Sequence, residues 1–231
     1  MNFLGIDMDY IVLVLPAVIF AMWAQANVSS TFKRYAKETV KCGMTGFDAA
    51  RSILDANGLR NVRIAQVAGE LTDHYNPSDN TIYLSEPVYG VNTAAAVGVA
   101  AHEAGHAVQH AVGYAPIKLR MAIIPITNIG SNLAMPLVLL GIALSFPALA
   151  YLGVIAFGCS TLFQLVTLPT EFNASSRAME ALKASGRLNS NELASSRKVL
   201  TAAALTYVAA LAVSLANLIR IFLIARRSDR K

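Results

Sequence analysis

Four stretches of the chain are apolar over a length that can cross a lipid bilayer, which takes about 20 helical residues. Helical spans are expected over residues 10–26, 121–146, 148–168 and 201–225. Pro147 alone separates the second span from the third, and almost nothing polar lies beside it. We therefore predict that these two spans form a tight transmembrane hairpin.

The polar remainder falls into two pieces between the spans. The resulting organisation is an N-terminal transmembrane anchor (1–26), a polar domain (27–120), a transmembrane hairpin (121–168), a helical segment (169–200), and a C-terminal transmembrane helix with a basic tail (201–231). Because two spans separate the polar pieces, both are predicted to lie on the same face of the membrane.

Periodicity inside the first polar piece predicts a small mixed domain. Apolar residues at helical spacing indicate helices over residues 30–42, 46–57 and 91–112, and Gly58 follows the second as a left-handed cap. Two β-branched runs, 61–67 and 81–85, indicate strands, and the segment between them is dense in turn residues. A small hairpin or sheet followed by a helix is the simplest arrangement.

The helix predicted over 91–112 carries the sequence His102-Glu103-Ala104-Gly105-His106, an HExxH motif. Positions i and i+4 lie one above the other on a helix, so both imidazoles can reach one metal ion. Glu103 then lies beside the metal without binding it. Two nitrogen ligands, an open coordination position and a nearby carboxylate are what hydrolytic zinc chemistry needs.

Composition supports a membrane protein over a nucleic-acid binder. The chain is 55% apolar with a mean hydropathy of +0.49, which exceeds what one soluble core of this size requires. Its net charge is +5, but the Lys and Arg residues flank the apolar runs and form no basic stripe. We expect the bilayer as a partner and no nucleic acid. The two cysteines, Cys42 and Cys159, are too few for a disulfide framework and are expected to be free thiols.

The distribution of Lys and Arg also bears on orientation. Most of the Lys and Arg residues near the span ends lie on the membrane face that carries the helix predicted over 91–112. The opposite membrane face has only the tail residues Arg226, Arg227, Arg230 and Lys231. The excess predicts a cytoplasmic site and an external N-terminus. The basic tail favours the opposite orientation.

A catalytic zinc usually has a third protein ligand. His110 continues the i, i+4 spacing of His102 and His106 by four more residues. Eight helical residues rise about 12 Å, however, so His102 and His110 cannot bind the same ion. His110 is therefore expected to pack against the helix or to support a ligand. Glu171, just after Pro169 at the end of the third span, is the preferred candidate, with Thr170 expected to cap a new helix. From spacing alone the alternatives are Glu180, Glu192, His74 and Asp73.

Four segments together resemble a known family. They are Leu-Thr-Asp-His-Tyr-Asn-Pro at 71–77, Ile-Tyr-Leu-Ser at 82–85, Ala-Ala-His-Glu-Ala-Gly-His-Ala-Val-Gln-His at 100–110, and Leu-Pro-Thr-Glu-Phe-Asn-Ala-Ser at 168–175. The combination is similar to the YugP-type family of bacterial membrane zinc metallopeptidases, over nearly the whole chain. More distantly the chain resembles the HtpX-like and CAAX prenyl proteases.

The resemblance implies a Zn²⁺ ion bound by His102, His106 and Glu171, with Glu103 as catalytic base. In the distant relatives an aspartate four residues after the glutamate ligand supports a zinc histidine. Ser175 stands at that position here, so the support is either weaker or comes from another residue such as Asn173. The likeness to HtpX also implies a role in membrane-protein quality control, and no oligomeric state follows from the sequence.

The expected fold is therefore a mainly α, multi-pass membrane protein with a small zincin-like α+β catalytic domain that carries HExxH on a helix. The expected reaction is hydrolysis of peptide bonds in a peptide or protein substrate by a metal-activated water. The oxyanion needs a further donor besides zinc, and the candidates for such transition-state or substrate contacts are His74, Tyr75, His110 and Arg177. Alternatively, His74 is a turn residue satisfied by its own loop.

The run 81–85 has two interpretations: an edge strand that pairs with an extended substrate, or an ordinary core strand. Two rival functions also remain. A site-2-type intramembrane protease would take an aspartate ligand from a later span, yet no Asp occurs between Asp79 and Asp229. A non-catalytic scaffold with a structural metal would need a fourth ligand, and it leaves Glu103 unexplained.

Overall fold

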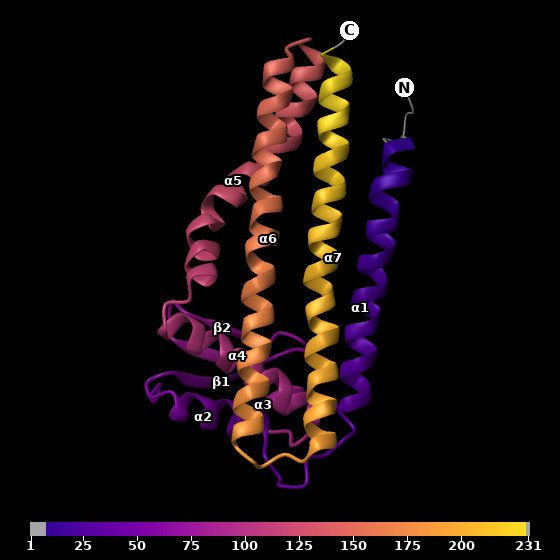
Figure 1. The fold of residues 1–231 in the computed structure, drawn as a ribbon. Coiled ribbons are helices and arrows are strands. Elements are labelled where there is room, and N and C mark those ends of the chain that lie inside the picture. Colours follow the sequence, from indigo (N-terminus) through magenta and orange to yellow (C-terminus); the bar gives the residue numbers. More distant parts are fainter. Residues whose placement is uncertain (1–7, 230–231) are drawn as a thin grey trace. The chain divides into compact units, whose positions relative to one another are not determined.

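The computed structural model describes residues 8–229, and most of them are helical (Figure 1). The elements in chain order are η1 (Tyr10–Val14), α1 (Leu15–Tyr35), α2 (Gly46–Ala56), β1 (Arg63–Val67), β2 (His74–Asn76), β3 (Thr81–Ser85), α3 (Glu86–Tyr89), α4 (Ala94–Ala111), α5 (Ala115–Ala143), α6 (Pro147–Ala184) and α7 (Ser190–Ser228). The HExxH residues lie in the second half of α4.

Four helical segments of the described chain are long and apolar enough to cross a membrane. They are Tyr10–Tyr35, Ala115–Ala143, Pro147–Ala184 and Ser190–Ser228. Large apolar side chains on them face outward, including Ile129 at 62% and Ile155 at 67% relative exposure. Exposed apolar surface on this scale is unfavourable in water and ordinary in lipid, so the four candidate spans fit a membrane protein.

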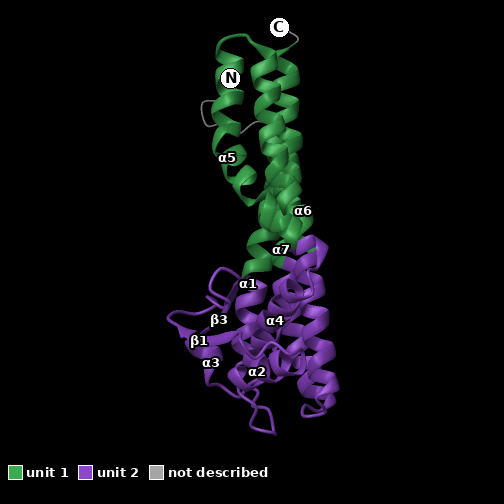
Figure 2. Ribbon diagram, turned by 90° about the vertical axis from the view of Figure 1, so that its left-hand side faces the viewer, with its two compact units in different colours: residues 1–25, 118–168, 206–231 green, residues 26–117, 169–205 purple. Residues whose placement is uncertain are grey.

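The chain divides into two compact units (Figure 2). One unit comprises Ala26–Ile117 and Pro169–Leu205, and we call it the motif unit because it holds α4. The other consists of the remaining described residues and contains α5 with the apolar parts of α1, α6 and α7. In this second unit the hydroxyls of Thr161 on α6 and Ser214 on α7 are 2.8 Å apart and hydrogen-bonded.

Several helix boundaries differ from the prediction. Of the separate helix expected over 30–42, residues 30–35 are the last part of α1, which ends at Tyr35, and residues 36–42 are not helical. Pro169 does not end a helix but lies inside α6, so Thr170 is no N-cap. Likewise, α7 begins at Ser190 rather than near residue 201. Proline and polar residues are tolerated inside long apolar helices where neighbouring elements satisfy the backbone, so they are weaker stop signals here.

The sheet has three strands in the order β1-β3-β2. β3 pairs in parallel with β1 and antiparallel with β2, so it is the central strand. The interpretation of 81–85 as a substrate-binding edge strand is therefore wrong. Its sequence was open to both interpretations because a central strand, buried on both faces, has the same apolar run as a covered edge. β2 arises within the turn-rich segment that separates the predicted strands.

Local capping and burial explain how α2 and α4 form. Thr45 and Asp48 make a reciprocal capping box at the start of α2, and Gly58 after its end has a φ of +73°. The Thr93 side chain accepts the Ala96 N–H at 3.3 Å and caps α4. Because α4 is apolar on nearly every side, it is buried in the core of the motif unit.

Candidate metal centre

Three potential metal ligands converge in the motif unit. α4 places the His102 and His106 rings one turn apart, with their Nε2 atoms 3.1 Å from each other. α6 brings the carboxylate of Glu171 to the same point, with Oε2 at 3.2 Å from His102 Nε2 and 3.4 Å from His106 Nε2. Glu171 is only 2% exposed. The three side chains thus form one cluster of donor atoms within 4.8 Å of one another.

The spacing of these donors fits a tetrahedral metal ion. Two ligands bound at about 2.0–2.1 Å with a tetrahedral angle between them lie about 3.3 Å apart. The distances among the three donor atoms, 3.1, 3.2 and 3.4 Å, are close to that value. Two imidazoles and one carboxylate are also a common ligand set of catalytic zinc. The residues present can therefore hold zinc.

Gly105 allows α6 to approach α4 closely. A Cβ atom at this position would lie 2.6 Å from the carbonyl oxygen of Ala174, a backbone atom that cannot rotate away. A side chain here would push α6 outward, and Glu171 and Ser175 with it. The glycine within HExxH thus has a packing role in bringing the carboxylate to the histidines.

Ser175 is a hydrogen-bond partner of His102. Its Oγ lies 3.1 Å from His102 Nδ1, on the ring edge away from Glu171. A hydrogen bond from Nδ1–H to this hydroxyl leaves the lone pair of Nε2 free for a metal. Ser175 therefore occupies the position, four residues after Glu171, where the distant relatives have an aspartate. Asn173, the alternative supporting residue, contacts Gln109 and Arg177 instead.

Gln109 supports His106 in the same way, and sequence reasoning missed it. Its Oε1 lies 3.0 Å from His106 Nδ1, and its Nε2 donates to Thr170 O at 2.8 Å and Asn173 Oδ1 at 3.0 Å. Gln109 is fully buried. A buried amide with all these bonds fixes the tautomer of His106 and ties α4 to α6. The available signal was a lone Gln three residues after the second histidine of the motif.

The electrostatics of the cluster favour a cation. Burial acts to lower the pKa of the His106 imidazole, but the carboxylates of Glu171 and Glu103 outweigh burial and raise that pKa above its ordinary value. Charges that stabilise an imidazolium also stabilise a divalent metal ion at the same point. The centre is therefore electrostatically suited to bind a cation.

Glu103 is held beside this cluster by the edge strand. The residue is 8% exposed, and its Oε2 accepts the backbone N–H of Tyr75 in β2 at 3.0 Å. Asp73 fixes the segment just before β2, because its carboxylate accepts the backbone N–H of Ser85 at 2.7 Å and the Ser85 hydroxyl at 2.8 Å. Burial raises the pKa of the Asp73 carboxyl against the opposing effect of these two bonds. The strand thus positions the carboxylate that the motif provides.

The alternative candidates for the third ligand have other partners. Asp73 is bound to Ser85, and Glu180 accepts the Ser176 hydroxyl at 3.1 Å. Glu192 accepts the N–H groups of Lys41 and Asn189, both at 2.8 Å. Among the candidates weighed, Glu171 is the one that the structure places against both histidines.

The candidates for transition-state contacts are distributed differently. His74 is exposed, stacks on Tyr83 with 5.0 Å between ring centroids, and has Nδ1 at 2.8 Å from Thr72 O in its own loop. The Tyr75 ring packs against the exposed His110 ring at 5.9 Å. Arg177 donates from Nε to Asn173 Oδ1 at 2.8 Å. Arg177 thus takes part in the Gln109 network, and the backbone of Tyr75 contacts Glu103.

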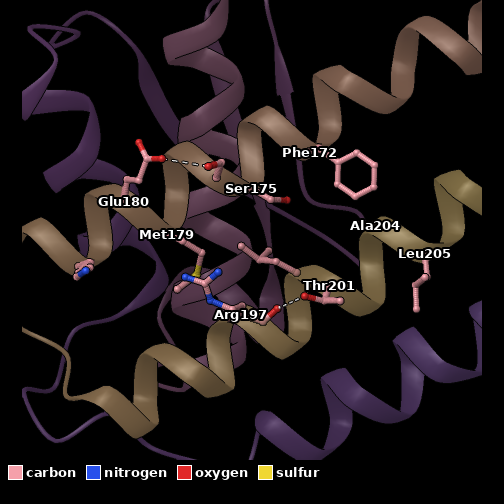
Figure 3. A pocket seen from close by; sticks show the side chains of 11 residues that line it. Phe172, Ser175, Met179, Glu180, Arg197, Thr201, Ala204 and Leu205 are labelled. Carbon is pink, nitrogen blue, oxygen red and sulfur yellow. Dashed lines mark hydrogen bonds between the residues drawn. The ribbon is translucent and has the colours of Figure 1, made fainter.

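Ser175 also borders a cavity of about 470 Å³ between α6 and α7 (Figure 3). Ser175, Met179 and Glu180 lie on its α6 side, and Arg197, Thr201 and Ala204 on its α7 side. None of His102, Glu103, His106 or Glu171 is among the lining residues. The cavity is therefore separate from the donor cluster, and its lining residue Ser175 bonds to one of the two histidines.

The sequence matches known proteins along most of its length. Residues 10–226 match the family described as "Putative neutral zinc metallopeptidase". The chain is also 46% identical over 217 residues to the protein called "Putative membrane protease YugP" from Bacillus subtilis (strain 168), which covers 94% of this chain and 96% of that relative. No solved structure matches significantly. The family implies Zn²⁺ as the cofactor, in agreement with the donor cluster. With a match over nearly all of its residues, the chain belongs to this family of neutral zinc metallopeptidases.

Proposed function

We propose that the protein is a membrane-bound zinc endopeptidase whose catalytic domain is the motif unit, a zincin-like α+β domain. The observation that carries this proposal is the cluster of His102, His106 and Glu171 with the carboxylate of Glu103 beside it. The family and the Bacillus subtilis relative, whose name calls it a membrane protease, support the same activity.

In the proposed mechanism, the metal would activate the substrate and the water, and Glu103 transfers the proton. Zinc held by His102, His106 and Glu171 would act as a Lewis acid on the substrate carbonyl and lower the pKa of a water in its open position toward about 7. Glu103 takes the proton of the attacking water and later delivers it to the leaving amine. The Tyr75 N–H holds one carboxylate oxygen of Glu103, which leaves the other free for this proton.

Two features favour this reaction over the rival functions. α4 is not one of the four candidate spans of residues 8–229, and Glu171, although on the candidate span α6, lies in the part of it that belongs to the motif unit. Both observations support a site outside the lipid core rather than intramembrane cleavage. The described residues offer three donors at the cluster, not the four of a closed structural site. The proposed face is the cytoplasmic one, because Lys and Arg residues concentrate near the span ends on the side of the motif unit.

Activity should depend on zinc. We expect the purified full-length protein in detergent to bind one zinc and cleave an unfolded protein such as casein. A strong chelator should abolish the cleavage, and added Zn²⁺ should restore it. Peptide fragments are identified by mass spectrometry. Stoichiometric zinc without cleavage of any unfolded soluble or membrane substrate would contradict the proposal and favour the scaffold.

The biological role that we propose is removal of damaged membrane proteins. It rests on the resemblance to HtpX-like proteases. Membrane proteomes of cells with wild-type protein and with an inactive Glu103→Gln variant should differ by full-length substrates that accumulate or remain bound to the variant. Identical proteomes under conditions that damage membrane proteins would argue against this role.

The hydroxyl of Ser175 should increase zinc affinity. We expect Ser175→Ala to weaken zinc binding by roughly ten- to hundredfold, because partners of zinc histidines commonly contribute that much. Ser176→Ala is a matched control, since Ser176 is the next residue on α6, is exposed, and bonds to Glu180 instead. Competition with a chromophoric chelator measures both. Equal affinities of the two variants would show that Ser175 does not support the ligand.

A further inference from the structure

The motif unit contains a second cleft, distinct from the donor cluster, between α1 and α7. Its volume is about 330 Å³, within the range of about 300–1,000 Å³ typical of small-molecule sites. The polar lining includes Thr31 and Arg34 from α1 and Arg197, Lys198 and Thr201 from α7. Leu205 adds an apolar wall. The cleft therefore combines a cationic part with an apolar part.

Three cations meet in this cleft without a counter-charge. Arg34, Arg197 and Lys198 are exposed, and no acidic residue lines the cleft. Within residues 8–229 none of the three makes an ion pair. Glu38, an acidic residue just beyond the end of α1, accepts the hydroxyl of Ser195 at 2.7 Å instead. The cleft is thus complementary in charge to an anion.

Tyr35 holds two of these cations near each other. Its ring is buried, with 5% of the residue exposed. Arg34 Cζ lies 5.5 Å from the ring centroid, and Lys198 Nζ lies 5.8 Å from it. Cation–π contacts at these distances stabilise the side chains where they are, although the charges repel each other. A bound anion would relieve that repulsion.

Arg197 also lines the larger cavity between α6 and α7, where it lies on α7 with Thr201 (Figure 3). That cavity is lined by a second cation, Lys183, but also by the carboxylate of Glu180, which reduces its attraction for anions. The α1–α7 cleft has no such residue in its lining. It is therefore the better anion site of the two.

We propose that this cleft binds the phosphate headgroup of an anionic phospholipid. Both helices that form it are candidate spans, Tyr10–Tyr35 and Ser190–Ser228, and the cleft lies where their polar ends begin. Basic residues at such a position attract anionic headgroups. The hydroxyl of Thr31 can donate to a phosphate oxygen, whereas the Thr201 hydroxyl donates to the Arg197 carbonyl oxygen at 2.9 Å. Leu205 begins the apolar surface on which an acyl chain can lie. This apolar side favours a lipid over free phosphate.

Lipid binding to the purified full-length protein tests the proposal. Native mass spectrometry in neutral detergent would measure retention of phosphatidylglycerol and phosphatidylcholine. We expect a preference for phosphatidylglycerol, and an affinity roughly a hundredfold lower in the triple variant Arg34→Gln, Arg197→Gln, Lys198→Gln, since each cation contributes about fivefold. The single variant Arg197→Gln should lose about fivefold, which keeps the test informative if the triple variant does not fold.

A matched variant removes the same charge elsewhere. Lys33, Lys37 and Lys41 are exposed lysines of the same region that do not line the cleft, and their replacement by Gln should leave phosphatidylglycerol binding within about twofold of wild type. Arg34→Lys with Arg197→Lys should retain most of the binding. An equal loss in the Lys33, Lys37, Lys41 variant, or no preference over phosphatidylcholine, would overturn the site. Displacement of the lipid by excess inorganic phosphate would show a free-anion site and overturn the lipid assignment.

Discussion

Peptide hydrolysis should fall by at least about a hundredfold, and up to about 10⁴-fold, in the Glu103→Gln variant, because general acid–base catalysis contributes effects of this size. Glutamine has nearly the shape of glutamate, and its carbonyl oxygen can accept the Tyr75 N–H that now binds Glu103 Oε2 at 3.0 Å. It cannot take up a proton from water. The side chain should therefore remain in place while its chemistry is lost.

Zinc content distinguishes this loss from a damaged site. Glu103 is not one of the three clustered donors, so the variant should bind zinc as the wild-type protein does. Single-turnover cleavage of a fluorogenic peptide, together with metal analysis of the same sample, measures both properties. Glu180→Gln serves as the control, since Glu180 is exposed and bonded to Ser176. Undiminished proteolysis by Glu103→Gln would exclude Glu103 as the base.

The sequence contained enough to locate the cluster. Helical spacing places His102 and His106 on one face, and helix rise excludes His110 as a co-ligand. Two spans between the polar pieces leave Glu171 on the same side as the motif. The structure brings these three donors together, although α6 is continuous through Pro169. The count of spans, rather than the expected helix break, was the useful part of that reasoning.

Other features depend on packing that periodicity does not reveal. Three residues of the turn-rich segment form β2 by pairing with β3, and bonds from the Tyr75 N–H to Glu103 and from Ser85 to Asp73 hold the segment there. Gln109 looks like one more polar residue in a helix until Asn173 and Thr170 are seen on α6. Tertiary contacts decide both cases, since short strands and single amides carry little local signal.

The third ligand is tested by Glu171→Gln. We expect this variant to lose both cleavage and zinc, with zinc affinity reduced more than about a hundredfold. Even residues that only hydrogen-bond to a zinc ligand contribute about ten- to hundredfold to metal affinity. This result differs from Glu103→Gln, which should lose cleavage alone. Glu192→Gln and Glu180→Gln remove two of the other acidic candidates and should bind zinc normally, because Glu192 accepts backbone N–H groups and Glu180 accepts the Ser176 hydroxyl.

Stability separates the loss of a ligand from the loss of the fold. Glu171 is a buried carboxylate in contact with His102 and His106, and a neutral amide in its place removes the negative partner of both rings, which destabilises the metal-free protein. Zinc that binds only the folded state should raise the unfolding temperature of the wild-type protein and of Glu103→Gln. We expect Glu171→Gln to unfold at the same temperature with and without zinc, below that of the metal-free wild type. A zinc-dependent rise equal to that of the wild type would show that another residue completes the site, and Glu171 would then be no ligand.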